Sequence, residues 1–158
     1  MTKFSISAIA ISIGLAFSAG VSAHEMSKVQ YKSAKRAIAT EYRSAAAACI
    51  AVWGSVRDGG PEKSRREICQ AEAKGARRVA NAELEARYSP SNHTRYELNV
   101  ARAKAGHLIA RKRCNEADEV LKSCLQQARA VEVHAMADAA ATLGAANAAK
   151  VTKETSKP

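Results

Sequence analysis

Apolar positions recur along the chain at the three- and four-residue spacing of one helix face. The first such stripe begins after Ser27, whose spacing to Gln30 is that of an N-terminal capping box, and it ends before Gly54 or the Asp58-Gly59-Gly60 turn. The second starts at Pro61 or three residues later at Ser64, and Ser89-Pro90 ends it. The expected inward positions are Tyr31, Ile38, Tyr42, Ala45, Cys49 and Val52, then Cys69, Ala73, Ala76, Ala80, Leu84 and Tyr88.

The second half of the chain repeats this organisation. A capping-box pattern at Thr94 to Glu97 predicts the start of a third helix, and a fourth carries apolar residues from Leu121 until the pattern fades around Gly144. The inward positions are Tyr96, Val100, Ala103, His107, Ala110 and Cys114, then Leu121, Cys124, Ala128, Val131 and Ala135. No strand pattern competes, so we predict an all-α fold.

Four cysteines divide into two pairs, each flanking a turn signal. Residue 59, midway between Cys49 and Cys69, lies within Asp58-Gly59-Gly60-Pro61, and residue 119 lies midway between Cys114 and Cys124. Although three pairings exist in principle, this geometry favours Cys49–Cys69 and Cys114–Cys124 as clamps near the tips of two antiparallel helical hairpins. A metal site is the weaker alternative, because no C-x-x-C motif occurs and no His has zinc spacing from a Cys.

The start of the chain matches an export signal. Lys3 precedes an uncharged, mostly apolar run over residues 4–20, and Val21-Ser22-Ala23 fits a cleavage site. A membrane anchor is the alternative, but the run is short and interrupted by Ser and Gly. We expect a periplasmic or secreted protein with no membrane span after cleavage. The expected segments are 1–23 signal peptide, 24–88 first hairpin, 89–93 linker, 94–147 second hairpin and 148–158 disordered tail.

Composition limits the core. Residues 24–158 contain 30 Ala and no Phe, and Ala buries little apolar area. A large α/β enzyme domain is therefore excluded, and no catalytic motif or cofactor-binding loop occurs. We expect a non-enzymatic protein without a cofactor, built as a four-helix bundle or as an elongated coiled-coil-like rod. Its oligomeric state is open.

Charge gives the strongest indication of a partner. The chain has a formal net charge of +10, which attracts anionic partners. Basic residues gather near both expected hairpin tips, and the candidate contacts are Arg65, Arg66, Arg111, Lys112 and Arg113. We predict an acidic envelope protein or an anionic lipid or lipopolysaccharide surface as partner, with adaptor or chaperone-like activity toward clients. Nucleic acid is disfavoured by the export signal and the scarcity of aromatic residues.

Copper handling is a second hypothesis. Cleavage after Ala23 makes His24 the N-terminal residue, whose α-amino and ring nitrogens can chelate Cu(II) together. A functional copper site needs further ligands, and His107 or His134 are the weak candidates for them. On its inward stripe, His107 is better interpreted as a packed core residue.

The order of several motifs resembles an uncharacterised group of small exported proteobacterial proteins. The motifs are Tyr42-x6-Cys49, Ile68-Cys69-x-x-Glu72-Ala73-Lys74, Ala82-Glu83-Leu84-Glu85, Tyr88, Arg113-Cys114 and Cys124-x-x-x-Ala128. These proteins are rich in Ala and Lys, carry Cys-paired helical repeats and are loosely labelled TolA-like or cell-envelope proteins. The resemblance covers roughly residues 26–140 and implies helical hairpins in the cell envelope, but no catalytic residues. In size, charge and compartment the chain also looks broadly like the small basic helical chaperones of the periplasm.

Overall fold

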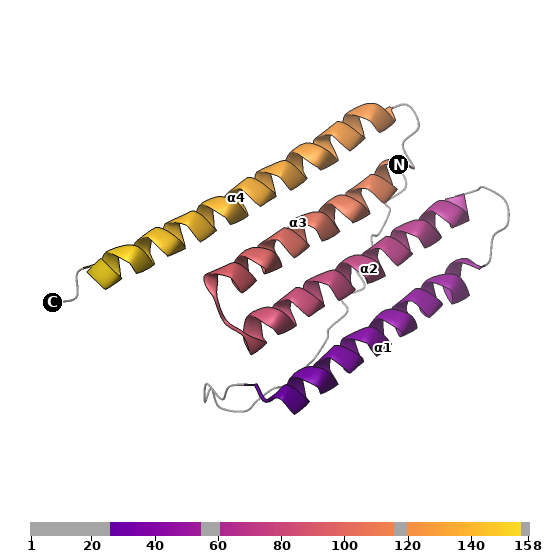
Figure 1. The fold of residues 1–158 in the computed structure, drawn as a ribbon. Helices are drawn as coiled ribbons and strands as arrows, with labels where there is room; N and C mark the ends of the chain where they lie inside the picture. The colour runs from indigo at the N-terminus through magenta and orange to yellow at the C-terminus, as the bar shows by residue number, and fades with distance from the viewer. Residues whose placement is uncertain (1–25, 55–60, 116–119, 156–158) are drawn as a thin grey trace, which may run out of the picture.

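The computed structural model describes residues 26–54, 61–115 and 120–155. They form four antiparallel helices: α1 (Lys28–Trp53), α2 (Pro61–Tyr88), α3 (Asn92–Cys114) and α4 (Leu121–Thr155) (Figure 1). The predicted all-α fold class is confirmed. The predicted export signal at 1–23 and the predicted turns around residues 59 and 119 lie outside the described residues.

The two disulfides join the residues that the sequence pairs. Cys49 is bonded to Cys69, with their Cα atoms 5.7 Å apart, and Cys114 to Cys124, with Cα atoms 5.6 Å apart. Cys49 and Cys114 are among the most buried side chains of the protein. Because α1 and α3 run toward the hairpin tips and α2 and α4 run away from them, both disulfides lie at one end of the molecule, here called the tip end (Figure 1).

The helices pack in chain order, α1 on α2, α2 on α3 and α3 on α4. The hairpins therefore lie side by side, as in a bundle, and not end to end, as in a rod. The bundle is open, because α1 and α4 form opposite edges of a row instead of closing on each other (Figure 1). A row leaves two broad faces of the described helices exposed.

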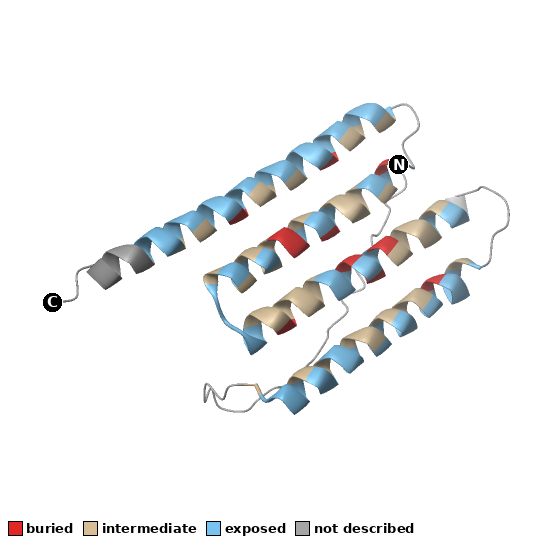
Figure 2. Ribbon diagram, in the orientation of Figure 1, coloured by how far each residue is buried: buried red, intermediate tan, exposed pale blue. Residues whose placement is uncertain are grey.

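The core is as thin as the composition implies. Among the described residues, Leu84 is the one large aliphatic side chain that is almost fully buried, and small residues supply most of the rest of the core. Figure 2 shows how few buried positions each helix has. Ala71, Ala101 and Ala105 are buried between α2 and α3, and a Cβ built on Gly75 would lie 3.3 Å from the Ala105 Cβ. Small residues thus let the two hairpins approach closely.

Helix starts agree with the sequence prediction at α1 and differ at α3. The Ser27–Gln30 capping box is present, with both reciprocal hydrogen bonds. In α3 the cap is Ser91, which forms its box with Thr94, so the observed cap lies three residues before the predicted cap Thr94. Thr94 is instead the third residue of the helix, where its hydroxyl accepts a hydrogen bond from the Ser91 backbone N–H. The predicted linker 89–93 shortens to three residues.

Two other expectations need correction. The predicted disordered tail from residue 148 is helical as far as Thr155, because its Ala and Lys residues continue a helix well and no breaker precedes Pro158. Of the expected inward positions, Val52, Ala76, Tyr88 and Val131 are exposed, Val52 to 68% and Val131 to 63%. Val52 and Val131 belong to edge helices, which have one packed neighbour each. Ala76 and Tyr88 belong to the inner helix α2, and Tyr88 is its last residue.

Candidate anion-binding surface

The five basic residues predicted as contacts all lie near the tip end, but they do not form one patch. The Lys112 Nζ donates to Glu67 at 2.8 Å, and the Arg113 guanidinium donates to Glu72 at 2.8 Å. Both bonds join α3 to α2. Residues 112 and 113 are about 100° apart around the helix. Their two ion pairs therefore lie on either side of the α2–α3 contact, one toward each broad face of the row.

Of the other three predicted contact residues, two contact the end of α1 and one is exposed to solvent. The Arg66 guanidinium donates to the Gly54 carbonyl oxygen at 2.9 Å, where the first hairpin turns. Arg65 lies over the Trp53 ring, 5.4 Å from its centroid. Arg111 is exposed. Much of this basic charge therefore closes the tip end of the fold.

Contacts between helices identify which residues share one broad face. Lys35 forms an ion pair with Glu85 at 3.7 Å, Arg77 lies 4.8 Å from the Tyr42 ring centroid, and Lys112 contacts Glu67. We call this face the basic face. Helical periodicity places the following basic residues on it: Lys28, Lys32, Lys35, Arg36, Arg43, Lys63, Lys74, Arg77, Arg78, Lys104, Arg111, Lys112, Lys122 and Arg129. Its acidic residues are Glu67, Glu85 and Glu97.

The opposite face has nearly balanced charge. Arg102 donates to Glu83 at 2.9 Å, and Arg113 is paired with Glu72. Helical phase adds Arg65, Arg87, Arg95, Glu41 and Asp138 to this face. The excess positive charge of the described helices is therefore concentrated on one side of the row.

Sequence reasoning missed this face because it searched for clusters along the chain. Its signal in the sequence is a seven-residue spacing between basic residues on several helices at once, which returns a side chain to nearly the same helix face. Arg95 and Arg102 have this spacing on the opposite face, so the spacing identifies the basic face only together with the packing of the helices. Lys28 and Lys35 on α1, Lys104 and Arg111 on α3, and Lys122 and Arg129 on α4 all have this spacing. Contiguous runs such as Arg111-Lys112-Arg113 instead distribute charge around the helix.

A shallow groove of about 910 Å³ lies between α3 and α4 on the opposite face. Small residues such as Ala103, Gly106 and Ala135 line it. His107 contacts Glu132 through its Nδ1, and the two side chains are 15% and 17% exposed. The interpretation of His107 as a packed residue is supported, with the addition of an acidic partner across the helix interface.

The proposed metal ligands are not brought together in the part of the chain that the structure describes. His24 lies outside that part, and His134 is exposed on α4. All four cysteines are in disulfides. Residues 26–54, 61–115 and 120–155 contain no group of three or more His, Cys, Asp or Glu residues able to hold a metal.

None of the described helices is both long enough and apolar enough to cross a membrane. Comparison with known proteins found no matching family model, no matching curated protein and no matching solved structure. The resemblance to exported Ala/Lys-rich proteins therefore stays a prediction.

Proposed function

We propose that this chain is a non-enzymatic exported helical protein that binds anionic components of the cell envelope through its basic face. The observation that carries the proposal is the unequal distribution of charge between the two faces of the row. A chain that needs charge for general repulsion between copies has no need to concentrate it on one side. Charge on one broad face attracts an extended anionic surface.

The dimensions of the face favour a lipid or lipopolysaccharide surface as partner. Helices pack about 8–10 Å apart, and 23 to 28 residues span about 35–42 Å. Four helices in a row thus offer a broad face to many headgroups at once. Each basic residue held near an anionic surface contributes about 1 kcal/mol, so several together give useful affinity without a deep pocket.

Export supports the same proposal from independent features. Residues 1–23 have the pattern of a cleavable signal, and two disulfides suit an oxidising compartment. We therefore place the protein in the periplasm, where phosphorylated lipid and glycolipid headgroups are accessible. An acidic protein as partner is an outcome that the test below distinguishes.

The test is binding of the oxidised protein starting at His24 to vesicles, measured by co-sedimentation. Vesicles with anionic headgroups should bind the protein at low salt, and zwitterionic vesicles should not. Affinity should fall as ionic strength rises, because salt screens exposed charges. If the protein binds neither kind of vesicle but retains one acidic protein from envelope extracts at physiological salt, the lipid-surface proposal is wrong.

A further inference from the structure

The basic face contains a hollow of about 360 Å³ at the point where α1 and α3 both approach α2. Ala46, Ala71 and Leu108 supply its apolar part. A volume near the lower end of the range for small-ligand sites suits one small polar group.

The polar lining comes from three helices. Tyr42 belongs to α1, Gln70 and Lys74 to α2, and Lys112 to α3. Among the described residues, no hydrogen-bond partner is present for the Tyr42 hydroxyl, the Gln70 side-chain amide or the Lys74 ammonium. The hollow thus brings together hydrogen-bond donors from different helices, and these donors are not engaged in hydrogen bonds within the described fold.

Glu67 is the acidic group of the hollow, and its charge is already compensated. The Lys112 ammonium donates to its carboxylate at 2.8 Å. This hydrogen bond, with further attraction from Lys63 and Arg66, keeps the pKa of Glu67 below its usual range. Lys74 and the Arg77 guanidinium stacked on Tyr42 then leave positive charge in excess.

We propose that this hollow binds a single phosphate group, with Lys74 supplying the uncompensated charge, the Lys112 ammonium adding a further donor, and the Tyr42 hydroxyl and Gln70 amide donating hydrogen bonds. A phosphate fits better than a carboxylate, because its tetrahedral oxygens can accept bonds from donors on three helices at once. This inference rests on the proposed function and deepens it. The phosphate belongs either to a lipid or glycolipid headgroup or to free phosphate, and the two sources are distinguished below.

Tyr42→Phe is the decisive variant because it removes one donor without changing the charge or the ring under Arg77. Its matched control is Tyr96→Phe, on α3 and outside the hollow. Lys74→Gln is paired in the same way with Lys104→Gln, which removes one charge from the basic face away from the hollow. The full oxidised chain starting at His24 is used throughout, and circular dichroism confirms that each variant is folded.

Two probes separate the sources of phosphate. Affinity is measured for vesicles containing phosphatidic acid, whose headgroup is a phosphate monoester, and for inorganic phosphate by chemical-shift titration. For vesicles we expect Tyr42→Phe to weaken binding about tenfold and Tyr96→Phe to leave it unchanged, with Lys74→Gln more damaging than Lys104→Gln. The same pattern with inorganic phosphate alone would assign the site to free phosphate.

The failure of this inference is distinct from the failure of the proposed function. If wild type binds vesicles, Tyr42→Phe binds equally well, and Lys74→Gln matches Lys104→Gln, the hollow is not a site and diffuse charge suffices. If wild type does not bind anionic vesicles but binds inorganic phosphate in a Tyr42-dependent way, the proposed function is wrong and the site stands. Loss of both activities in wild type overturns both.

Discussion

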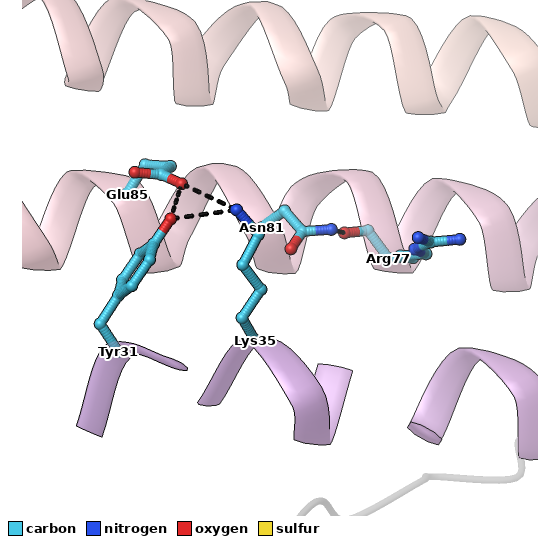
Figure 3. A network of polar contacts seen from close by, with 5 residues as sticks. All are labelled: Tyr31, Lys35, Arg77, Asn81 and Glu85. Carbon is cyan, nitrogen blue, oxygen red and sulfur yellow. Dashed lines mark hydrogen bonds and ion pairs between the residues drawn. The ribbon is translucent and has the colours of Figure 1, made fainter. Parts of the chain in front are cut away.

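Tyr31 of α1 donates a hydrogen bond from its hydroxyl to the carboxylate of Glu85 on α2 (Figure 3). Lys35 donates to the same hydroxyl at 3.1 Å, and the Tyr31 ring lies 4.3 Å from that of Tyr88. Hydrogen bonding to Tyr31 and the charge of Glu85 raise the pKa of Lys35. This cluster lies at the opposite end of the first hairpin from its disulfide, so both ends of the hairpin are closed.

The first prediction concerns this closure. Tyr31→Phe keeps the ring contact but leaves Glu85 without its phenol donor, so we expect the melting temperature to fall by about 2–5 °C. Tyr42→Phe is the control, because its hydroxyl has no hydrogen-bond partner among the described residues. Thermal unfolding followed by circular dichroism measures both. Equal melting temperatures for Tyr31→Phe and wild type would show that the cluster does not stabilise the hairpin.

The disulfides give a second prediction. Replacing both cysteines of a pair by serine should cost about 3 kcal/mol and lower the melting temperature by roughly 6–12 °C, with the helical spectrum at low temperature largely kept. The Cys49–Cys69 link spans 20 residues and the other spans 10. Loss of the longer link should therefore cost about 0.6 kcal/mol more. Four free thiols in the protein isolated from its native compartment would contradict this account.

The thin core gives a third prediction. Leu84 on α2 is 1% exposed, so Leu84→Ala should lower the free energy of unfolding by about 2–5 kcal/mol. Val52→Ala on the exposed edge of α1 should change it by less than about 0.5 kcal/mol. Urea denaturation of both variants measures the difference. A small effect at Leu84 would mean that the core does not depend on this residue.

A fourth prediction uses the helical glycines. Nothing lies within 4 Å of a Cβ built on Gly106 or Gly144, so alanine at either position should stabilise the protein by about 0.5–1 kcal/mol. Gly75 differs, because its Cβ would lie 3.3 Å from Ala105. Gly75→Val should therefore force α2 and α3 apart and destabilise the fold by about 1–3 kcal/mol. Stabilisation by Gly75→Val in urea denaturation would contradict the close packing of the hairpins.

Acid should remove the contribution of the Lys112–Glu67 ion pair. The pKa of Glu67 is lowered in the folded protein from its usual 4.5. The pair therefore stabilises the fold above that value, and the contribution is lost as the pH falls through the lowered pKa. At pH 7, Glu67→Gln should melt about 1–3 °C below wild type, and the gap should narrow only as the pH is lowered below 4.5. A gap that already closes above pH 4.5, or that does not narrow at any lower pH at which the protein still folds, would rule out this ion pair as the cause.

The sequence predicted the disulfides, the helix count and the α1 cap because each depends on residues close together in the chain. It found one apolar stripe for each helix, whereas α2 and α3 each bury two. The missed positions include Ala71 and Ala105. Ala occurs on every side of these helices, so apolar periodicity could not separate a packed Ala from an exposed one.

Side-chain pairing between helices was harder to predict. Reflecting the hairpin about residue 59 sets Lys35 opposite Glu83, but Lys35 pairs with Glu85, and Glu83 pairs with Arg102. Residues 83 and 85 are about 200° apart around α2, so they serve different neighbours. The same geometry hid the basic face, which depends on how three or four helices are placed together and not on any one segment.

The measurement that tests the central claim most directly compares two triple variants in the vesicle assay. Lys32→Gln, Arg78→Gln and Lys104→Gln remove three charges from the basic face, and Arg65→Gln, Arg87→Gln and Arg95→Gln remove three from the opposite face. Both proteins have the same net charge. At about 1 kcal/mol for each basic residue, the first triple should bind anionic vesicles roughly a hundredfold more weakly, and the second should bind within about threefold of wild type. Equal losses in the two variants would contradict a binding surface on one face.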